Sequence, residues 1–209
     1  MRVALINGSP KFKDSTSAIL LDTIKELFDN RCEIAEFHFN KTSVSDEDLE
    51  KLKDSGAIIF AFPLYIDGIP GHLLSCLEQI DKAGILNRNV YIYGICNCGF
   101  YEGIQTDTAL NILRNWSCKA GSAWGGGIGV GGGGCITLLP KLPVYKGPKA
   151  SIDKELKVMT DNVICKVSQD NRYTNVNMPR FAYKQAAQFG WRQKIKANGL
   201  TVADLGRKL

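Results

Sequence analysis

The sequence predicts an α/β protein with a parallel sheet, because short apolar runs alternate with stretches of helical periodicity. Three runs, residues 2–6, 57–62 and 90–95, are apolar apart from Arg2 at the start of the first, and they are too short to be helices. Each is followed by a segment whose apolar residues recur every three or four positions. Strands that are buried on both faces are typical of a parallel sheet covered by helices on both sides.

The first strand leads into a helix through a small polar loop. Residues 2–6 are bounded by Gly8 and Pro10, and from Ser17 onward residues such as Leu20 repeat at helical spacing. This arrangement places backbone N–H groups and hydroxyls around the positive end of a helix. Such a site suits a phosphate group.

The remaining elements predict a doubly wound order. After the first helix we expect a half-buried edge strand (32–39), a short helix (45–52), a buried strand (57–62), a helix from Pro70, a buried strand (90–95), a helix (103–116), a glycine-rich strand (124–130), a connecting loop (136–150) and a last helix (151–167). Five β/α units in 209 residues match the flavodoxin-like three-layer sandwich, whose five-stranded parallel sheet has the order 2-1-3-4-5.

We expect two parts of unequal size, a cofactor-binding domain over residues 1–170 and a basic helical appendage over residues 171–209. The net charge is +5. From Arg180 onward the chain has seven Lys or Arg and one acidic residue, Asp204, so the rest of the chain is near neutral. A solvated helix face accounts for this charge, and contact with an anionic nucleotide cofactor is the alternative. We expect no nucleic-acid partner.

Several features predict a cytoplasmic protein. The longest apolar stretch, residues 57–66, contains Pro63 and is far shorter than the roughly 20 residues of a membrane span. Met1 and Arg2 lead directly into the first strand, so we expect no signal peptide and no membrane partner. The seven cysteines are scattered and odd in number, which fits a reducing compartment.

In this fold the loops after strands 1, 3 and 4 lie at one edge of the sheet, beside the switch point of the topology. The first loop supplies hydroxyls, backbone amides and one amine for a phosphate: Ser9, Lys11, Ser15, Thr16 and Ser17. The second, from Pro63, offers Leu64, Tyr65 and Ile66 as surfaces for a flat aromatic ring. In the third, Gly99 permits close backbone approach to the polar edge of such a ring. This composition suits a flavin.

These loops resemble a known family. Gly8-Ser-Pro-Lys11, Ser15-Thr-Ser17, Pro63-Leu-Tyr65 and Pro70 are similar to segments of the NADPH-dependent FMN reductases. The resemblance covers residues 1–135 and is greatest to the branch of iron–sulfur flavoproteins and flavodoxin-like NAD(P)H oxidoreductases. It implies that the first loop holds the FMN phosphate and that the other two hold the isoalloxazine. The residues that take these roles by resemblance are Ser9, Lys11, Ser15, Thr16, Ser17, Pro63, Leu64, Tyr65, Ile66, Asn97, Cys98, Gly99, Phe100 and Tyr101.

Two departures from the family pattern limit what is carried over. Lys11 stands where the family usually has an arginine, which is the better bidentate partner for phosphate. The compact cysteine cluster of the iron–sulfur branch is also missing, since only Cys76 and then Cys96-Asn-Cys98 are present in that region. We therefore predict neither an iron–sulfur cluster nor any other metal site.

Other patterns have simpler interpretations. A formal G-x-G-x-x-G at Gly127, Gly129 and Gly132 lies in or after the last strand, where a dinucleotide fingerprint does not occur. We interpret the run as a strand that a neighbouring backbone, a second subunit or the flavin approaches closely. Cys96 and Cys98 are interpreted as small residues in a tight turn, with a redox pair as the alternative.

The sequence thus predicts an FMN-dependent oxidoreductase that passes hydride from NAD(P)H through flavin N5 to an acceptor. The acceptor, a quinone, a flavin, another small molecule or a protein, is left open, as is the choice of NADH or NADPH. The cofactor supplies the chemistry, so no catalytic side chain is predicted. We expect a homodimer in which the glycine-rich segment and the appendage make contacts. The alternatives are an electron carrier of the flavodoxin type without nicotinamide turnover, and a flavin-free phosphate-binding enzyme.

Overall fold

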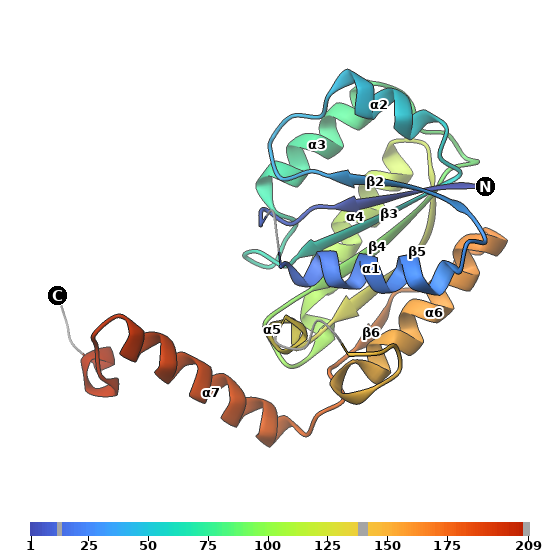
Figure 1. The fold of residues 1–209 in the computed structure, drawn as a ribbon. Helices are drawn as coiled ribbons and strands as arrows, with labels where there is room; N and C mark the ends of the chain where they lie inside the picture. The colour runs from blue at the N-terminus through green and yellow to red at the C-terminus, as the bar shows by residue number, and fades with distance from the viewer. Residues whose placement is uncertain (12–13, 138–141, 207–209) are drawn as a thin grey trace. The chain divides into compact units, whose positions relative to one another are not determined.

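The computed structural model describes residues 1–11, 14–137 and 142–206, and part of the connecting loop expected at 136–150 lies outside these ranges. The chain divides into two units, Met1–Asn177 and Met178–Leu209. The first unit holds the sheet and the helices that cover it (Figure 1). None of the helices in the described part of the chain is long and apolar enough to cross a membrane.

The first unit is built on one parallel sheet with the strand order β2-β1-β3-β4-β5-β6. The strands are β1 (Arg2–Asn7), β2 (Glu33–His38), β3 (Ala57–Pro63), β4 (Tyr91–Asn97), β5 (Ala123–Val130) and β6 (Arg172–Thr174). The predicted order 2-1-3-4-5 is confirmed, but the predicted count of five strands is wrong. The short β6 pairs with β5 only over Ile128–Val130, and its residues have neither an apolar run nor an alternating pattern that periodicity could detect.

Helices cover both faces of the sheet and form the expected three layers (Figure 1). On one face lie α1 (Thr16–Phe28) and α6 (Ala150–Cys165), and on the other α2 (Asp46–Lys53), α3 (Gly71–Lys82) and α4 (Asp107–Lys119). Short helical turns complete the connections: η1 (Gly103–Thr106), α5 (Gly133–Ile136) and η2 (Gly147–Lys149). The single helix expected at 103–116 is therefore divided into η1 and α4.

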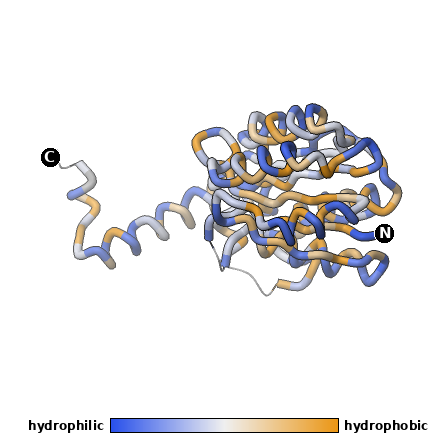
Figure 2. Tube along the Cα trace, turned by 90° about the horizontal axis from the view of Figure 1, so that it is seen from above, coloured by the Kyte–Doolittle hydropathy of each residue, from blue (hydrophilic) through white to orange (hydrophobic). Residues whose placement is uncertain are grey.

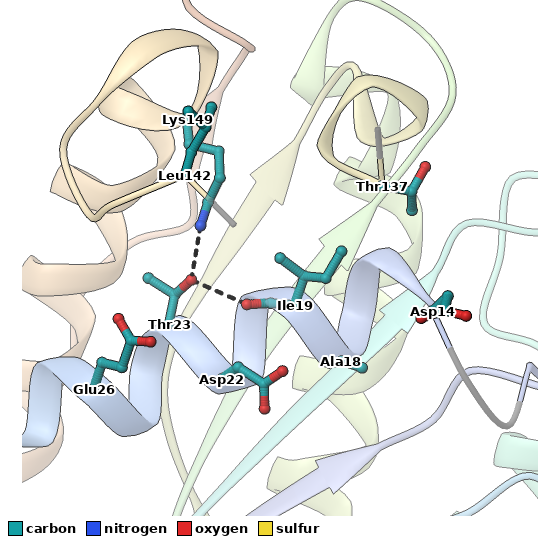
Figure 3. Close-up of a pocket in the computed structure, with 9 residues that line it drawn as sticks. All are labelled: Asp14, Ala18, Ile19, Asp22, Thr23, Glu26, Thr137, Leu142 and Lys149. Carbon is teal, nitrogen blue, oxygen red and sulfur yellow. Dashed lines mark hydrogen bonds between the residues drawn. The ribbon is translucent and has the colours of Figure 1, made fainter. Parts of the chain in front are cut away.

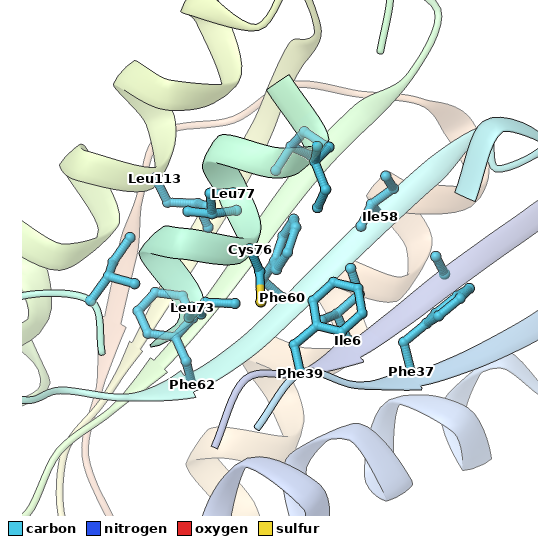
Figure 4. Close-up of a cluster of buried hydrophobic side chains, with 14 of the residues drawn as sticks. Ile6, Phe37, Phe39, Ile58, Phe60, Phe62, Leu73, Cys76, Leu77 and Leu113 are labelled. Atoms are coloured by element: carbon cyan, nitrogen blue, oxygen red, sulfur yellow. The ribbon is translucent and has the colours of Figure 1, made fainter. Parts of the chain in front are cut away.

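The core follows from the two-residue repeat of the central strands. Ile58, Phe60 and Phe62 of β3 face the helix α3, where Leu73 and Cys76 are fully buried against them (Figure 4). Figure 2 shows hydrophobic residues concentrated along the strands at the centre of this unit. Each fully buried side chain of this size contributes about 1.5–3 kcal/mol. The core therefore fixes the strand register, and with it the position of every loop at the edges of the sheet.

The second unit has a different character. It consists of α7 (Arg180–Ala197) and η3 (Val202–Gly206), and no side chain of α7 is buried. Phe181 is 74 % exposed and Trp191 is 65 % exposed. Residues 172–174, which the sequence analysis placed with the appendage, form β6 in the first unit.

Candidate functional site

The loops after β1, β3 and β4 leave the sheet side by side. The Gly8 N–H donates to the Ala61 carbonyl at 2.8 Å, so the first loop begins against β3. The Leu64 N–H donates to the Asn97 carbonyl at 2.8 Å, which joins the second loop to the end of β4. The convergence that the topology predicts is thus present at the carboxyl edge of the sheet.

Local hydrogen bonds shape the first loop. Asn7 Oδ1 accepts from the Ser9 N–H at 3.0 Å, and Ser9 Oγ in turn accepts from the Lys11 N–H at 3.2 Å. Such side-chain-to-backbone bonds form a tight turn without helix or sheet pairing. His38 of β2, which sequence analysis did not include in the site, lies with Nε2 3.2 Å from the Ser9 carbonyl oxygen. Ser9 is buried and Lys11 is exposed.

The start of α1 offers hydrogen-bond donors. Ser15 caps the helix and its Oγ accepts from the Ala18 N–H at 3.1 Å. The N–H groups of Thr16 and Ser17, in the first turn, have no acceptor within the helix. The Ser9 and Ser15 hydroxyls each accept one backbone N–H and keep their own O–H for donation. This donor set at the positive end of a helix dipole suits an anion.

The second loop is a tight hairpin turn that presents side chains to solvent. Tyr65 and Gly68 exchange two backbone hydrogen bonds, at 3.1 and 3.0 Å, and the residues between them have φ values of 47° (Ile66) and 55° (Asp67). Two positive φ values in succession are typical of a type I′ turn. Tyr65 is 47 % exposed and Ile66 is fully exposed, whereas Leu64 packs against the hydrophobic core and Pro63 is half-buried.

Asn97 begins the third loop and ties it to the others. Its buried Nδ2 donates to Ser17 Oγ at 2.9 Å and to the Phe62 carbonyl at 3.0 Å. Beyond it, Phe100 is 55 % exposed, and a side chain added at Gly99 would meet open space. Tyr101 is half-buried. The loop therefore has a fixed base and an open outer part.

The two cysteines of this region are buried thiols. Cys96 belongs to the hydrophobic core, and Cys98 Sγ lies 3.7 Å from the carbonyl oxygens of Phe100 and Glu102. Burial raises the pKa of both thiols, so both are protonated at neutral pH. Redox-active cysteines have lowered pKa values, and the interpretation of these residues as small packed side chains is favoured.

A fourth segment, the glycine turn Gly131–Gly133 after β5, contacts the first and third loops, although sequence analysis did not include its residues among those of the site. The Gly133 N–H donates to the Cys98 carbonyl at 2.8 Å, and the Gly133 carbonyl accepts from Thr16 Oγ1 at 2.9 Å. A Cβ at Gly131 would lie 2.1 Å from the Tyr101 carbonyl oxygen. The expected close approach of a neighbouring backbone is thus confirmed. The signal available in the sequence was a glycine run directly after the last predicted strand, at the same edge of the sheet.

Comparison with known proteins gives similarity of structure only. No family model and no curated protein matches the chain. Among solved structures, the flavoenzyme NAD(P)H:(acceptor) oxidoreductase FerB from Paracoccus denitrificans is 16 % identical, with a TM-score of 0.57 over 78 % of this chain and 95 % of that one. A flavodoxin from Streptococcus pneumoniae is 12 % identical, with a TM-score of 0.53 over 80 % and 100 %.

A third structure, the Trp repressor binding protein from Bacillus subtilis, is 17 % identical with a TM-score of 0.51, over 62 % of this chain and 84 % of that one. At such identities the likeness is one of fold. The chain accordingly has a flavodoxin-like fold, and its site lies where ligands bind in doubly wound sheets.

Proposed function

We propose that the protein is an FMN-dependent oxidoreductase that takes electrons from NADH or NADPH and passes them to a small molecule or protein acceptor. The observation that carries this proposal is the buried contact between Asn97 and Ser17, which joins the ring-binding loop to the phosphate-binding turn. A ligand with an anionic group at one end and a planar group at the other would contact both the turn and the loop.

The first loop fits the phosphate end of FMN. The amides of Thr16 and Ser17 and the hydroxyls of Ser9 and Ser15 provide donors without a metal ion. Lys11 is exposed beside this turn and adds a positive charge. Its point charge orients a phosphate less strictly than an arginine would.

The second and third loops fit the ring end. Tyr65 and Phe100 are large apolar side chains that remain about half exposed, and they stand on loops joined by the hydrogen bond from Leu64 to Asn97. Burying aromatic surface against a flat ring is favourable. The open space around Gly99 lets the ring edge approach the backbone amides there.

Bound FMN would supply the hydride and electron transfer, and the protein's part is to hold and orient it. Asn97 fixes the relation between the two ends of the site, because its amide contacts both Ser17 and Phe62. The proposed reaction assigns no role to the buried thiols of Cys96 in β4 and Cys98 in the third loop.

Absorbance of the purified protein tests the proposal. We expect a flavin band that NADH or NADPH bleaches under anaerobic conditions within seconds and that oxygen or a quinone restores. A band that persists with both nucleotides would instead indicate an electron carrier. Failure to bind added FMN would contradict the proposal and favour a flavin-free phosphate-binding enzyme.

We also propose that the protein forms a homodimer through its second unit. Helix α7 exposes Phe181, Phe189 and Trp191 and buries none of its side chains. Most of the stability of helices in proteins comes from packing one face against other elements, and exposed aromatic residues are typical of protein interfaces. A second copy of the chain is the partner that every solution of this protein contains.

A further inference from the structure

Two neighbouring strands end beside the turn that contains Ser9. Asn7 is the last residue of β1 and His38 is the last residue of β2, and the two pair in register in the parallel sheet. Residues paired in this way direct their side chains to the same face of the sheet. The side chains of Asn7 and His38 therefore leave the sheet together, next to the turn that follows β1.

Both side chains hold the backbone of Ser9. Asn7 Oδ1 accepts from the Ser9 N–H at 3.0 Å. His38 Nε2 lies 3.2 Å from the Ser9 carbonyl oxygen. Because a carbonyl oxygen can only accept, Nε2 carries the hydrogen and donates it. The N–H and the carbonyl of Ser9 are thus held from two different strands.

These contacts set the direction of the Ser9 hydroxyl. Ser9 is only 3 % exposed, and its Oγ accepts from the Lys11 N–H at 3.2 Å. The hydroxyl keeps its own hydrogen for donation. A donor that is held in place before a ligand arrives loses less conformational freedom when the ligand binds. The turn therefore presents this O–H group in one orientation.

The hydrogen bond from His38 differs from the other two in its origin. Asn7 and Lys11 are each two residues from Ser9, so their hydrogen bonds form within the turn itself. His38 is 29 positions away in the sequence and belongs to another strand. Without its hydrogen bond the turn would keep its internal bonds but lose this tie to β2.

The cavity along α1 is separate from this arrangement (Figure 3). It has a volume of about 260 Å³. Its lining includes Thr23 of α1 and Lys149, whose Nζ donates to Thr23 Oγ1 at 3.1 Å. Asn7, Ser9 and His38 are not among the described residues that line it. The contacts of His38 therefore concern the turn after β1 and not this cavity.

We propose that His38 is a positioning residue for the phosphate of FMN and that it acts through Ser9. This inference rests on the proposed function and adds a residue to it. His38 holds the Ser9 carbonyl, and thereby orients the Ser9 hydroxyl toward the anion, without contacting the phosphate itself. The flavin ring is assigned to the second and third loops, so loss of the His38 hydrogen bond should weaken binding of the phosphate end alone.

Titration of the flavin-free, full-length protein with FMN and with riboflavin, followed by flavin fluorescence, tests this inference. Riboflavin has the same ring without the phosphate, so the ratio of the two affinities reports on the phosphate end. His38→Phe keeps an aromatic ring and removes the donor. We expect FMN binding to weaken about five- to tenfold and riboflavin binding to weaken less than about twofold. Equal weakening for both flavins, or no change for either, would overturn the inference.

Rescue by the conservative variant tests the role of the donor. His38→Gln places an amide N–H close to the position of the ring Nε2–H. We expect FMN affinity in this variant to lie within about threefold of that of the unaltered protein. A loss in His38→Gln as large as that in His38→Phe would show that the hydrogen bond is not what matters, and would overturn the inference.

A double variant tests whether His38 acts through Ser9. In a Ser9→Ala background the hydroxyl is already absent, so adding His38→Phe should weaken FMN binding by less than about a further twofold. The full five- to tenfold effect of His38→Phe in that background, by the same comparison of about five- to tenfold, would mean that His38 acts without the Ser9 hydroxyl. That result would overturn the inference.

His72→Phe is the matched control. His72 is the other of the two histidines in the chain, it lies in the first turn of α3, and its Nε2 has no hydrogen-bond partner among the described residues. We expect the ratio of FMN to riboflavin affinity to remain unchanged in this variant. A change equal to that in His38→Phe would overturn the inference.

The same titrations separate this inference from the proposed function. If the unaltered protein binds neither flavin, the proposed function is contradicted and the role of His38 with it. If the unaltered protein prefers FMN to riboflavin and His38→Phe keeps that preference, only the role of His38 is contradicted.

Discussion

The side-chain amide of Asn97 donates to the hydroxyl of Ser17 at 2.9 Å, across 80 positions of sequence. The same nitrogen donates to the Phe62 carbonyl at 3.0 Å. Asn97 is the last residue of β4, Ser17 stands in the first turn of α1, and Phe62 lies near the end of β3. One buried side chain therefore holds together the carboxyl ends of two strands and the start of a helix.

Replacement of this side chain should weaken both the fold and the site. Asn97→Ala removes two buried hydrogen bonds and leaves the Phe62 carbonyl and the Ser17 hydroxyl without their partner. We expect the free energy of unfolding to fall by about 2–4 kcal/mol. If the proposed site is correct, FMN affinity should fall as well. Urea denaturation and flavin titration measure the two effects.

Asn111→Ala is the control for this variant. Asn111 Nδ2 also donates to a side chain, Asp107 Oδ2 at 2.9 Å, but both residues belong to α4. We expect Asn111→Ala to lower the free energy of unfolding by much less than Asn97→Ala does, and to leave FMN affinity unchanged. Equal losses in the two variants would mean that the position of Asn97 at the loop junction has no special importance.

Ser9→Asp tests where the phosphate binds. The new carboxylate would stand in the turn proposed to hold the phosphate, and like charges in a confined site repel. We expect FMN affinity to fall by about tenfold or more. Riboflavin has the same ring without the phosphate, so its affinity should change much less. An equal loss for both flavins would point to a disrupted fold, and unchanged FMN affinity would place the phosphate elsewhere.

Sequence periodicity was sufficient for the central strands because their side chains are buried on both faces. Ile58 and Ile59 are both fully buried on opposite sides of β3. A short, continuous apolar run of this kind indicates a strand that is covered on both faces of a parallel sheet. The loops after these strands could therefore be placed without coordinates. Strand β6 could not, because Arg172 and Thr174 are held by backbone pairing to β5 and their side chains contribute no pattern.

The glycine turn shows a second limit of sequence analysis. The three consecutive glycines Gly131–Gly133 indicate a segment without side chains, but the sequence does not indicate which other segment of the chain packs against it. The structure shows the Tyr101 carbonyl against Gly131 and the Cys98 carbonyl against Gly133. Such contacts depend on how the third loop returns from β4, which no local pattern encodes.

Gly131→Ala should be strongly destabilising. The added Cβ would lie 2.1 Å from the Tyr101 carbonyl oxygen and 2.6 Å from the Gly103 nitrogen, and both are backbone atoms that cannot rotate away. We expect a loss of about 3 kcal/mol or more in the free energy of unfolding. Gly134→Ala is the matched control, because its Cβ would meet nothing within 4 Å in the short helix α5.

Gly134→Ala should leave stability unchanged or raise it by up to about 1 kcal/mol, since alanine is the better helix former. Thermal and urea unfolding of the two variants give the comparison. Similar stabilities for both would contradict the close packing of the third loop against the glycine turn.

The buried thiol of Cys76 should make stability fall at alkaline pH. Burial raises the pKa of Cys76 to about 11 in the folded protein. Between the ordinary thiol pKa and this value, the unfolded chain releases a proton that the folded chain keeps. Folded protein therefore loses stability as pH rises, by up to about 1.4 kcal/mol per pH unit for this group.

Urea denaturation from pH 8 to pH 11 measures this slope. Cys76→Ala should make it shallower, even though the variant is less stable at every pH because a small cavity replaces the sulfur. Cys118→Ala is the control at an exposed position of α4 and should leave the slope as it is. An unchanged slope in Cys76→Ala would show that this thiol does not titrate differently in the two states.

The exposed aromatic residues of α7 should decide the assembly state. Phe181→Ala, Phe189→Ala and Trp191→Ala together remove its large apolar surface, and none of the three is buried in the chain itself. If the protein is a monomer, these changes should lower its stability only slightly, since no core packing is removed. An interface built on them would fail, because buried aromatic residues supply much of the binding energy at protein interfaces.

Light scattering separates these two cases. The unaltered protein should have twice the chain mass of 23.0 kDa, and the triple variant should have the mass of one chain. Lys184→Ala, at another exposed position of α7, is the control and should keep the dimer. If the unaltered protein already has the mass of one chain, the proposed dimer is contradicted. The exposed aromatic residues would then need a partner of another kind.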